Sequence, residues 1–276
     1  MSKVVIANVL SSLSIVTVLV FGAAHAGCNA DGDPCEVPLG TYHLALPESS
    51  EPTPALIFLH GAGGSGLGTI KMKSTLDRGY ALIGPNGLKR EGSRFGPGWS
   101  FIPGREKQRD EAAFMREIIA DVVENYNVDP DQILLAGFSV GGSMTSYLAC
   151  EDPTLAKAYA PVAGGFWDPL PEVGSCSGPV QLLHTHGWRD MTVPLEGRPL
   201  RSGVEQGDIF ATLAIWRVEN GCTAKRANRF SSDELFWRRA WDDCDAGALE
   251  FALHQGAHGI PKGWSEMILD WFEALP

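Results

Sequence analysis

Short apolar runs alternate along the chain with longer segments in which apolar residues recur at helical spacing. The short runs, bounded by glycine, proline and polar clusters, predict strands at 55–59, 80–83, 133–136, 158–162, 180–184 and 249–253. Residues 42–46 alternate in polarity and predict an earlier antiparallel strand, and 128–131 is predicted to be a turn. Helices are expected at 111–126, 143–150, 209–219 and 264–275. The alternation predicts an α/β fold with a mostly parallel, doubly wound sheet and helices on both faces.

A serine lies directly behind one of the predicted strands. Ser139 is the centre of Gly-Phe-Ser-Val-Gly at 137–141, between the strand at 133–136 and the helix at 143–150. A G-x-S-x-G pattern between strand and helix is typical of a sharp turn that exposes a nucleophilic serine. The chain holds 32 glycines, so the pattern alone also fits a glycine-rich turn around a buried serine. The placement favours the nucleophile and predicts a serine hydrolase.

A nucleophilic serine needs a base, and the base needs an orienting acid. Asp190 follows the strand at 180–184, and His258 follows the strand at 249–253. Both stand beyond the carboxyl ends of predicted strands, in the chain order serine, acid, histidine. Asp190 as a turn residue and His258 as a surface residue are the alternatives, and Asp168 is a rival acid. The combined order favours a triad of Ser139, Asp190 and His258.

Two backbone amides are expected to stabilise the oxyanion of such a reaction. They are the N–H of Val140, next to the nucleophile, and the N–H of Ala62, in the glycine-rich loop behind the strand at 55–59. That loop also matches G-x-G-x-x-G, which would bind a dinucleotide if an acid ended the next strand. The next strand ends in Gly-Pro-Asn-Gly at 84–87, without an acid. We therefore expect no nucleotide and no other cofactor.

Histidines near the predicted acid raise the possibility of a metal site. His184 and His186 share one strand face, and together with Asp190 and His258 they could be metal ligands. The alternative is a histidine pair packed beneath the site. We favour the packed pair and predict no metal.

Residues 1–26 have the pattern of a signal peptide. Lys3 precedes an apolar stretch, and small residues occupy both positions that specify cleavage after Ala26. A membrane anchor is disfavoured because the apolar stretch is short for a span. A lipoprotein is disfavoured because His25 stands where the lipid-attachment motif has leucine. We expect a secreted or periplasmic protein whose residues 27–276 form one catalytic domain.

Six cysteines in an exported chain predict three disulfides, for which 15 pairings exist. Pairing nearest neighbours joins Cys28 with Cys35 across a turn-rich loop. The same rule joins Cys150 with Cys176 and Cys222 with Cys244, but the sequence gives no further argument for these two pairs. Zinc is the rival interpretation, and the close Cys-x-x-Cys spacing that zinc sites favour is absent from the sequence.

Charge narrows the range of partners. The formal net charge of −11 argues against nucleic acids and anionic membranes. The expected partner is a small or oligomeric ester. The oligomeric state is not indicated.

Taken together, the motifs resemble a known family. His-Gly-x-Gly-Gly at 60–64, Pro-Gly-Trp-Ser-Phe at 97–101, the serine motif, His-Gly…Asp…Val-Pro at 186–194 and Gly-x-His at 256–258 are similar to the secreted polyhydroxybutyrate depolymerase and feruloyl esterase group of α/β-hydrolases. The resemblance runs from about Cys28 to the C-terminus. It implies an α/β-hydrolase fold and ester hydrolysis through an acyl-enzyme on Ser139, with Asp190 and His258 in the positions of acid and base.

Substrate preference is less well indicated. Trp99, Trp188 and Trp264, together with Phe101, are candidates for an acyl or aryl pocket, with core packing as the alternative for each. We expect a soluble ester or oligomer, of hydroxyalkanoate or feruloyl and acetyl type, rather than a crystalline polymer. A serine peptidase on the same fold and a non-catalytic surface-binding protein are the remaining alternatives.

Overall fold

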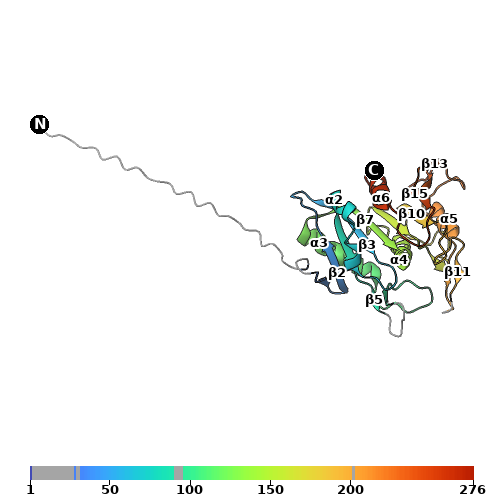
Figure 1. The fold of residues 1–276 in the computed structure, drawn as a ribbon, viewed down its shortest axis with the longest axis horizontal. Helices are drawn as coiled ribbons and strands as arrows, with labels where there is room; N and C mark the ends of the chain where they lie inside the picture. The colour runs from blue at the N-terminus through green and yellow to red at the C-terminus, as the bar shows by residue number, and fades with distance from the viewer. Residues whose placement is uncertain (2–27, 29–31, 90–95, 201–202) are drawn as a thin grey trace.

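The computed structural model describes residues 1, 28, 32–89, 96–200 and 203–276. Within these residues a ten-stranded sheet crosses the molecule (Figure 1). Its strands in chain order are β1 (Cys35–Val37), β2 (Gly40–Ala45), β3 (Thr53–Leu59), β4 (Ala81–Pro85), β7 (Val128–Phe138), β8 (Ala158–Val162), β10 (Gln181–Gly187), β13 (Arg229–Ser232), β14 (Trp237–Trp241) and β15 (Ala248–His254). Their spatial order is β1-β2-β4-β3-β7-β8-β10-β15-β14-β13. The middle of the sheet, from β4 to β15, is parallel, and both ends are antiparallel.

Helices cover both faces of this sheet. They are α1 (Gly66–Thr69), α2 (Lys73–Asp77), α3 (Glu111–Tyr126), α4 (Val140–Glu151), α5 (Ile209–Glu219) and α6 (Trp264–Glu273). Short strands form two small additional sheets, with β5 (Leu88–Lys89) on β6 (Pro97–Gly98), and β12 (Glu205–Gln206) between β9 (Trp167–Asp168) and β11 (Arg198–Pro199).

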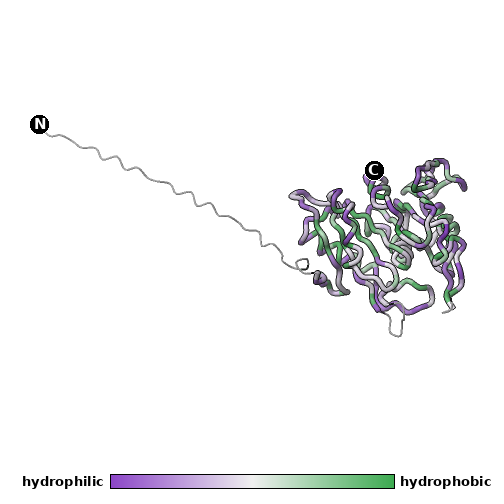
Figure 2. Tube along the Cα trace, viewed as in Figure 1, coloured by the Kyte–Doolittle hydropathy of each residue, from purple (hydrophilic) through white to green (hydrophobic). Residues whose placement is uncertain are grey.

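Two hydrophobic cores lie on opposite faces of the sheet, and β3 contributes to both. Ile57 and Leu59 face the core that holds the buried residues of α3, α4 and α5, whereas Leu56 and Phe58 face the core under α6. Successive side chains of a strand point to opposite faces of the sheet. Because both faces of β3 are buried, nearly all of its residues must be apolar. Figure 2 shows the same result, with hydrophobic segments in the central strands and hydrophilic ones at the periphery. The α/β-hydrolase fold expected from the sequence is therefore confirmed.

Most predicted elements occur at their expected places. The helices at 111–126 and 209–219 and the strand at 158–162 have the predicted bounds. The predicted turn at 128–131 is wrong, because β7 already begins at Val128, which pairs with Thr53. The pairing then shifts so that Ala55 meets Ile133, and the intervening residues form an irregularity within the strand.

The three predicted disulfides are present: Cys28 bonds Cys35, Cys150 bonds Cys176, and Cys222 bonds Cys244. The predicted signal peptide at 1–26 lies outside the described residues, apart from Met1. Among the residues described, no helix has both the length and the apolar character that crossing a bilayer requires.

A buried ion pair joins the loops on one side of the sheet. The guanidinium of Arg109 donates to Glu111 Oε2 at 2.7 Å, and both side chains are 2% exposed. Arg109 also donates to the carbonyls of Leu39 and Asn86, while Glu111 Oε1 accepts from the backbone N–H of Ser100. One pair of charges therefore fixes three separate loops to the start of α3.

Replacing Glu111 with Gln should be strongly destabilising, because it leaves the Arg109 charge buried without a partner. We expect a loss of about 3–5 kcal/mol in the free energy of unfolding, measured by urea denaturation. Glu151→Gln is the matched control, since Glu151 pairs with Lys107 at the surface, where both side chains are about half exposed. That variant should lose less than about 1 kcal/mol. Equal losses in the two variants would contradict the argument.

Candidate active site

The turn from β7 into α4 holds Ser139 in an unusual conformation. Its φ is 59° and its ψ is −122°, a backbone conformation that residues other than glycine rarely adopt. The turn is forced by close backbone contacts. A Cβ placed on Gly141 would lie 2.2 Å from the carbonyl oxygen of Leu59, and one on Gly137 would lie 2.4 Å from the carbonyl oxygen of Gly141. The two glycines of the motif are therefore required by packing, and they bring Ser139 to the carboxyl edge of the sheet.

The structure brings together the three residues that the sequence singled out as a triad. His258 Nε2 lies 2.9 Å from Ser139 Oγ, and His258 Nδ1 lies 2.7 Å from Asp190 Oδ2. The ring of Phe138 packs against the imidazole, with 4.7 Å between the ring centroids. The rival acid Asp168 is exposed on β9, and His258 pairs with Asp190 instead. This geometry suits proton transfer from a serine hydroxyl to an oriented imidazole.

Asp190 is held as a carboxylate by its surroundings. Burial by itself raises the pKa of this carboxyl, but the hydrogen bonds from His258 and from the backbone N–H groups of Val193 and Thr192 outweigh it and hold the pKa below its usual value. Both backbone groups donate to Oδ1 at 2.9 Å, which leaves Oδ2 for His258. The acid is thus charged and fixed in orientation.

Two histidines on β10 form a chain of hydrogen bonds behind this acid. His186 Nε2 donates to the carbonyl of Val193 at 2.8 Å, so His186 Nδ1 is an acceptor, and His184 Nε2 donates to it at 3.0 Å. Burial lowers the pKa of both residues, and lowers that of His184 furthest, so both rings are neutral. One nitrogen of each ring bonds the other ring, whereas His184 Nδ1 is buried without a hydrogen-bond partner. Through Val193, His186 steadies the turn that carries Asp190.

The predicted oxyanion donors lie on two elements that meet beside Ser139. Val140 is the first residue of α4, so its N–H has no acceptor within the helix. Ala62 lies in the loop behind β3, where a Cβ on Gly61 would approach within 3.4 Å of the Ser139 Cβ. Backbone hydrogen bonds from Gly63 to Pro97 and from Gly64 to Gly61 fix the loop beyond Ala62. The arrangement fits a pair of amides around a developing negative charge.

His60 anchors this loop. Its Nε2 accepts from the N–H of Gly87 at 3.0 Å, and its Nδ1 donates to the carbonyl of Gly61 at 2.7 Å. Burial lowers the pKa of the imidazole, which keeps it in this neutral form. The indole N–H of Trp99 donates to the carbonyl of His60 at 2.9 Å. This role of His60 and Trp99 was not predicted from the sequence, where the aromatic run at 97–101 was the available signal.

The third glycine of the G-x-G-x-x-G match packs closely against β4. A Cβ on Gly66 would lie 1.8 Å from the carbonyl oxygen of Gly84, and the Gly66 N–H donates to Asn86 Oδ1. The first N–H of α1 is therefore paired with the side chain of Asn86, which follows β4.

The three tryptophans assigned to substrate binding have different positions. The prediction for Trp264 is wrong, because its side chain is 1% exposed, packs edge-on against Phe58 and donates to Thr185 Oγ1 in the core. Trp99 is 6% exposed and supports the His60 loop from behind, so its predicted substrate contact is wrong as well. Phe101 is buried against Tyr147. Trp188 remains a candidate, since it is 59% exposed next to the turn of Asp190.

A family model described as phospholipase/carboxylesterase matches residues 44–203, which is more than half of the chain. The chain belongs to the phospholipase/carboxylesterase family. It is similar over 95% of its length to a probable feruloyl esterase C of Aspergillus niger, with 25% identity and 94% of that protein covered. It is also 25% identical to feruloyl esterase C of Emericella nidulans, over 80% of the chain and 77% of that protein. The chain is a carboxylic ester hydrolase, and it is similar to proteins named feruloyl esterase.

Several solved esterases have a similar fold. The acetyl xylan esterase from Aspergillus awamori superposes with a TM-score of 0.64 at 15% identity, covering 84% of this chain and 93% of that one. A carboxylesterase from Mesorhizobium loti gives a TM-score of 0.59 at 15% identity, covering 88% of this chain and 99% of that one. At 15% sequence identity, this similarity shows a shared fold and nothing about the substrate.

The neutral side chains of His184 and His186 should make the folded protein less stable in acid. Because their folded pKa values lie below the ordinary value of 6.5, the unfolded chain binds protons below that pH that the folded chain does not. The free energy of unfolding therefore falls as the pH falls below about 6.5, by up to about 1.4 kcal/mol per pH unit for each histidine. His184→Leu removes one such group and should make the decline shallower by up to that amount.

The measurement is urea unfolding of both proteins between pH 8 and 5. His184→Leu also leaves His186 Nδ1 without its donor, so a uniform loss of stability at pH 8 is expected and does not bear on the prediction. Parallel curves for the two proteins would show that His184 takes up a proton in the folded state.

Proposed function

We propose that this protein is an exported serine esterase that cleaves carboxylic esters through an acyl-enzyme. The observation that carries the proposal is the hydrogen-bonded series of Asp190, His258 and Ser139 at the edge of the sheet. Ser139 Oγ attacks the ester carbonyl while His258 Nε2 takes its proton. The same imidazole then gives the proton to the departing alcohol, and a water molecule hydrolyses the acyl-serine by the reverse sequence.

The surrounding groups support each step. Asp190 keeps the His258 Nδ1–H directed at its carboxylate and stabilises the imidazolium that forms when Ser139 loses its proton. The N–H groups of Val140 and Ala62 bind the oxyanion of the tetrahedral intermediate. No step of this reaction requires a cofactor.

The preferred substrates are esters of aromatic acids. Similarity to proteins named feruloyl esterase C supports this choice, and so do the exposed apolar side chains around the site. Trp188 and Met191 flank Asp190 and are 59% and 78% exposed, and Ile260 follows His258 and is 42% exposed. A planar aromatic acyl group would cover these side chains, whereas an acetyl group would leave them exposed to water.

Export and a single catalytic domain complete the proposal. Three disulfides favour an oxidising compartment, such as the outside of the cell or the periplasm. Cys35 and His254 belong to the first and last strands of one sheet, and this supports one domain over residues 27–276.

Ser139→Ala should abolish turnover while leaving the fold intact. We expect kcat on methyl ferulate to fall by a factor of about 10⁴ or more, with an unchanged melting temperature. The same assay with the wild type compares methyl ferulate, p-nitrophenyl acetate and 3-hydroxybutyrate oligomers, and kcat/KM should be highest for methyl ferulate. Full activity of Ser139→Ala would refute the serine mechanism, and a preference for the hydroxybutyrate oligomers would refute the aromatic substrate.

The choice of acid is tested by a matched pair of variants. Asp190→Asn keeps the shape of the side chain but loses its charge, and it should lower kcat by about 10³–10⁴ because it favours the wrong tautomer of His258. Asp168→Asn, at the exposed rival acid, should retain kcat within a factor of about two. The reverse result would identify Asp168 as the catalytic acid.

A further inference from the structure

A groove of about 450 Å³ lies on one face of the antiparallel end of the sheet. The residues that line it on this face form two rows across β13, β14 and β15, with Ser232, Trp237 and Leu253 in one row, and Phe230, Arg239 and Phe251 in the next. Side chains alternate along a strand, so paired residues and those two positions away share a face. The volume lies within the range of small-molecule sites, about 300–1,000 Å³.

Two of the aromatic side chains that line this groove are open to solvent. Phe230 is 58% exposed and Trp237 is 45% exposed. Phe210 of α5 is 49% exposed and packs edge-on against Phe251, with 6.0 Å between the ring centroids. Several large rings exposed around one concave surface are characteristic of a binding site.

One cation in the groove lacks a counter-charge. The guanidinium of Arg239 lies 5.6 Å from the ring centroid of Phe230, and among the described residues no carboxylate pairs with it. Its neighbours differ, since Arg238 pairs with Glu250, and Arg229 pairs with Asp242 and Glu250. In a chain with a net charge of −11, an unpaired guanidinium among aromatic rings favours an anionic ligand group.

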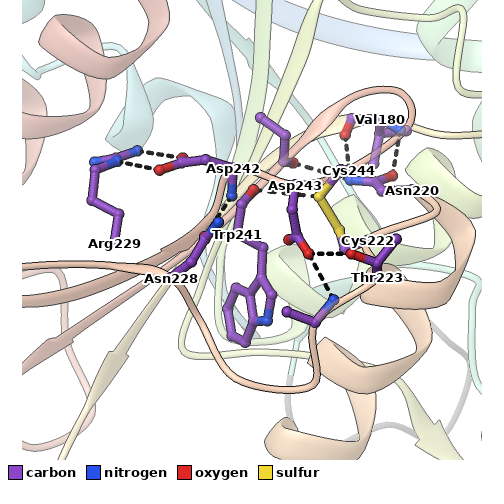
Figure 3. The surroundings of a disulfide bond; sticks show 12 residues. Val180, Asn220, Cys222, Thr223, Asn228, Arg229, Trp241, Asp242, Asp243 and Cys244 are labelled. Carbon is purple, nitrogen blue, oxygen red and sulfur yellow. Dashed lines mark hydrogen bonds and ion pairs between the residues drawn. A yellow bond between two sulfur atoms is a disulfide. The ribbon is translucent and has the colours of Figure 1, made fainter.

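The hairpin of β13 and β14 is fixed at its base, so the groove is formed in advance. Figure 3 shows the disulfide of Cys222 and Cys244, with Asp243 accepting from Thr223 beside it and Arg229 paired with Asp242 across the strands. A groove held in this way binds its ligand without paying for the ordering of a loop.

The first row of the groove lies at the carboxyl end of β15, which precedes His258 in the chain. Trp237 lies directly opposite Leu253, and β15 ends one residue later at His254, just before the loop of His258. The first row therefore lies at the end of β15 that leads into the loop of the proposed catalytic base.

We propose that this groove binds a sugar ring that bears a carboxylate, within the same oligosaccharide that carries the ester. This rests on the proposed function. The C–H face of a sugar ring packs on Trp237 and Phe230, because the face of an aromatic ring is electron-rich. The carboxylate pairs with the Arg239 guanidinium, and the Ser232 hydroxyl bonds to a ring hydroxyl. A peptide strand added along β13 is less suited to this edge, because Arg229 and Asp233 place charges at its two ends.

Binding is tested on the Ser139→Ala protein, so that hydrolysis does not interfere. By calorimetry, a xylotriose that carries one glucuronate should bind at least tenfold more tightly than xylotriose alone. Adding Arg239→Gln should remove that difference, and adding Trp237→Ala should weaken both ligands. Arg226→Gln, which removes an exposed charge outside the groove, is the matched control and should leave both affinities unchanged.

Three outcomes would overturn the proposal. They are equal affinity for the charged and neutral oligosaccharides, unchanged binding in Arg239→Gln and Trp237→Ala, and a dimer in sedimentation that Trp237→Ala dissociates, since the groove would then face a second copy of the chain. Melting temperatures within a few degrees of the parent protein would show that the variants are folded.

Kinetics separate this proposal from the catalytic one. With Ser139 present, Arg239→Gln should raise KM at least tenfold for a feruloyl ester of the glucuronate-bearing oligosaccharide, with kcat unchanged. Both parameters should stay the same on methyl ferulate. If neither the wild type nor Arg239→Gln hydrolysed either ester, the result would count against the esterase mechanism and not against the groove. If both hydrolysed the glucuronate-bearing ester with the same KM, the result would count against the groove and not against the mechanism.

Discussion

The close approach between the end of β3 and the first turn of α4 is the constraint from which the site follows. There is no room for a side chain between Gly141 and the carbonyl of Leu59. The chain can reach this position only through the left-handed conformation of Ser139, which directs the hydroxyl out of the sheet. The same approach places the first amide of α4 beside the loop that begins at His60. The proposed nucleophile and the proposed oxyanion donors are thus positioned by the same close contact between β3 and α4.

The protonation states of the side chains near Ser139 are set by burial and hydrogen bonds rather than by a large number of neighbouring charges. The imidazoles of His60, His184 and His186 are kept neutral because water cannot reach them, so each ring has one donor and one acceptor nitrogen in a defined place. Asp190 keeps its charge because two backbone N–H groups and His258 donate the hydrogen bonds that water would otherwise donate to the carboxylate. Such fixed dipoles do not need to reorient when charge develops at Ser139.

The sequence predicted the residues of the site better than their surroundings. Ser139, Asp190 and His258 stood at strand ends in a fixed order, and parallel strands bring such ends to one edge. The aromatic residues were harder, because Trp99, Trp188 and Trp264 look alike in a linear pattern. Trp99 supports the His60 loop, Trp188 is exposed and Trp264 is buried in the core. These differences arise from the packing of α6 and of the loop at 97–101, which the linear pattern does not show.

The antiparallel end of the sheet could not be predicted for a related reason. β13 and β14 carry several arginines and lack the apolar alternation of a half-buried strand, since they cover only the margin of the core. Long-range pairing decides their structure. The irregularity in β7 likewise depends on its pairing with β3, which local turn residues at 128–131 do not report.

The pairing of β15 with β10 has a consequence for the timing of activity. Residues that pair across this junction, such as Gln181 and Ala248, lie far apart in the sequence, and contacts of this kind form slowly. Until β15 docks, His258 is not held beside Ser139. Under the proposed mechanism, a chain emerging from the ribosome therefore acquires its base only after residues 248–258 have been made. The proposed nucleophile is synthesised earlier, so by this mechanism the chain has no activated serine until β15 has paired with β10.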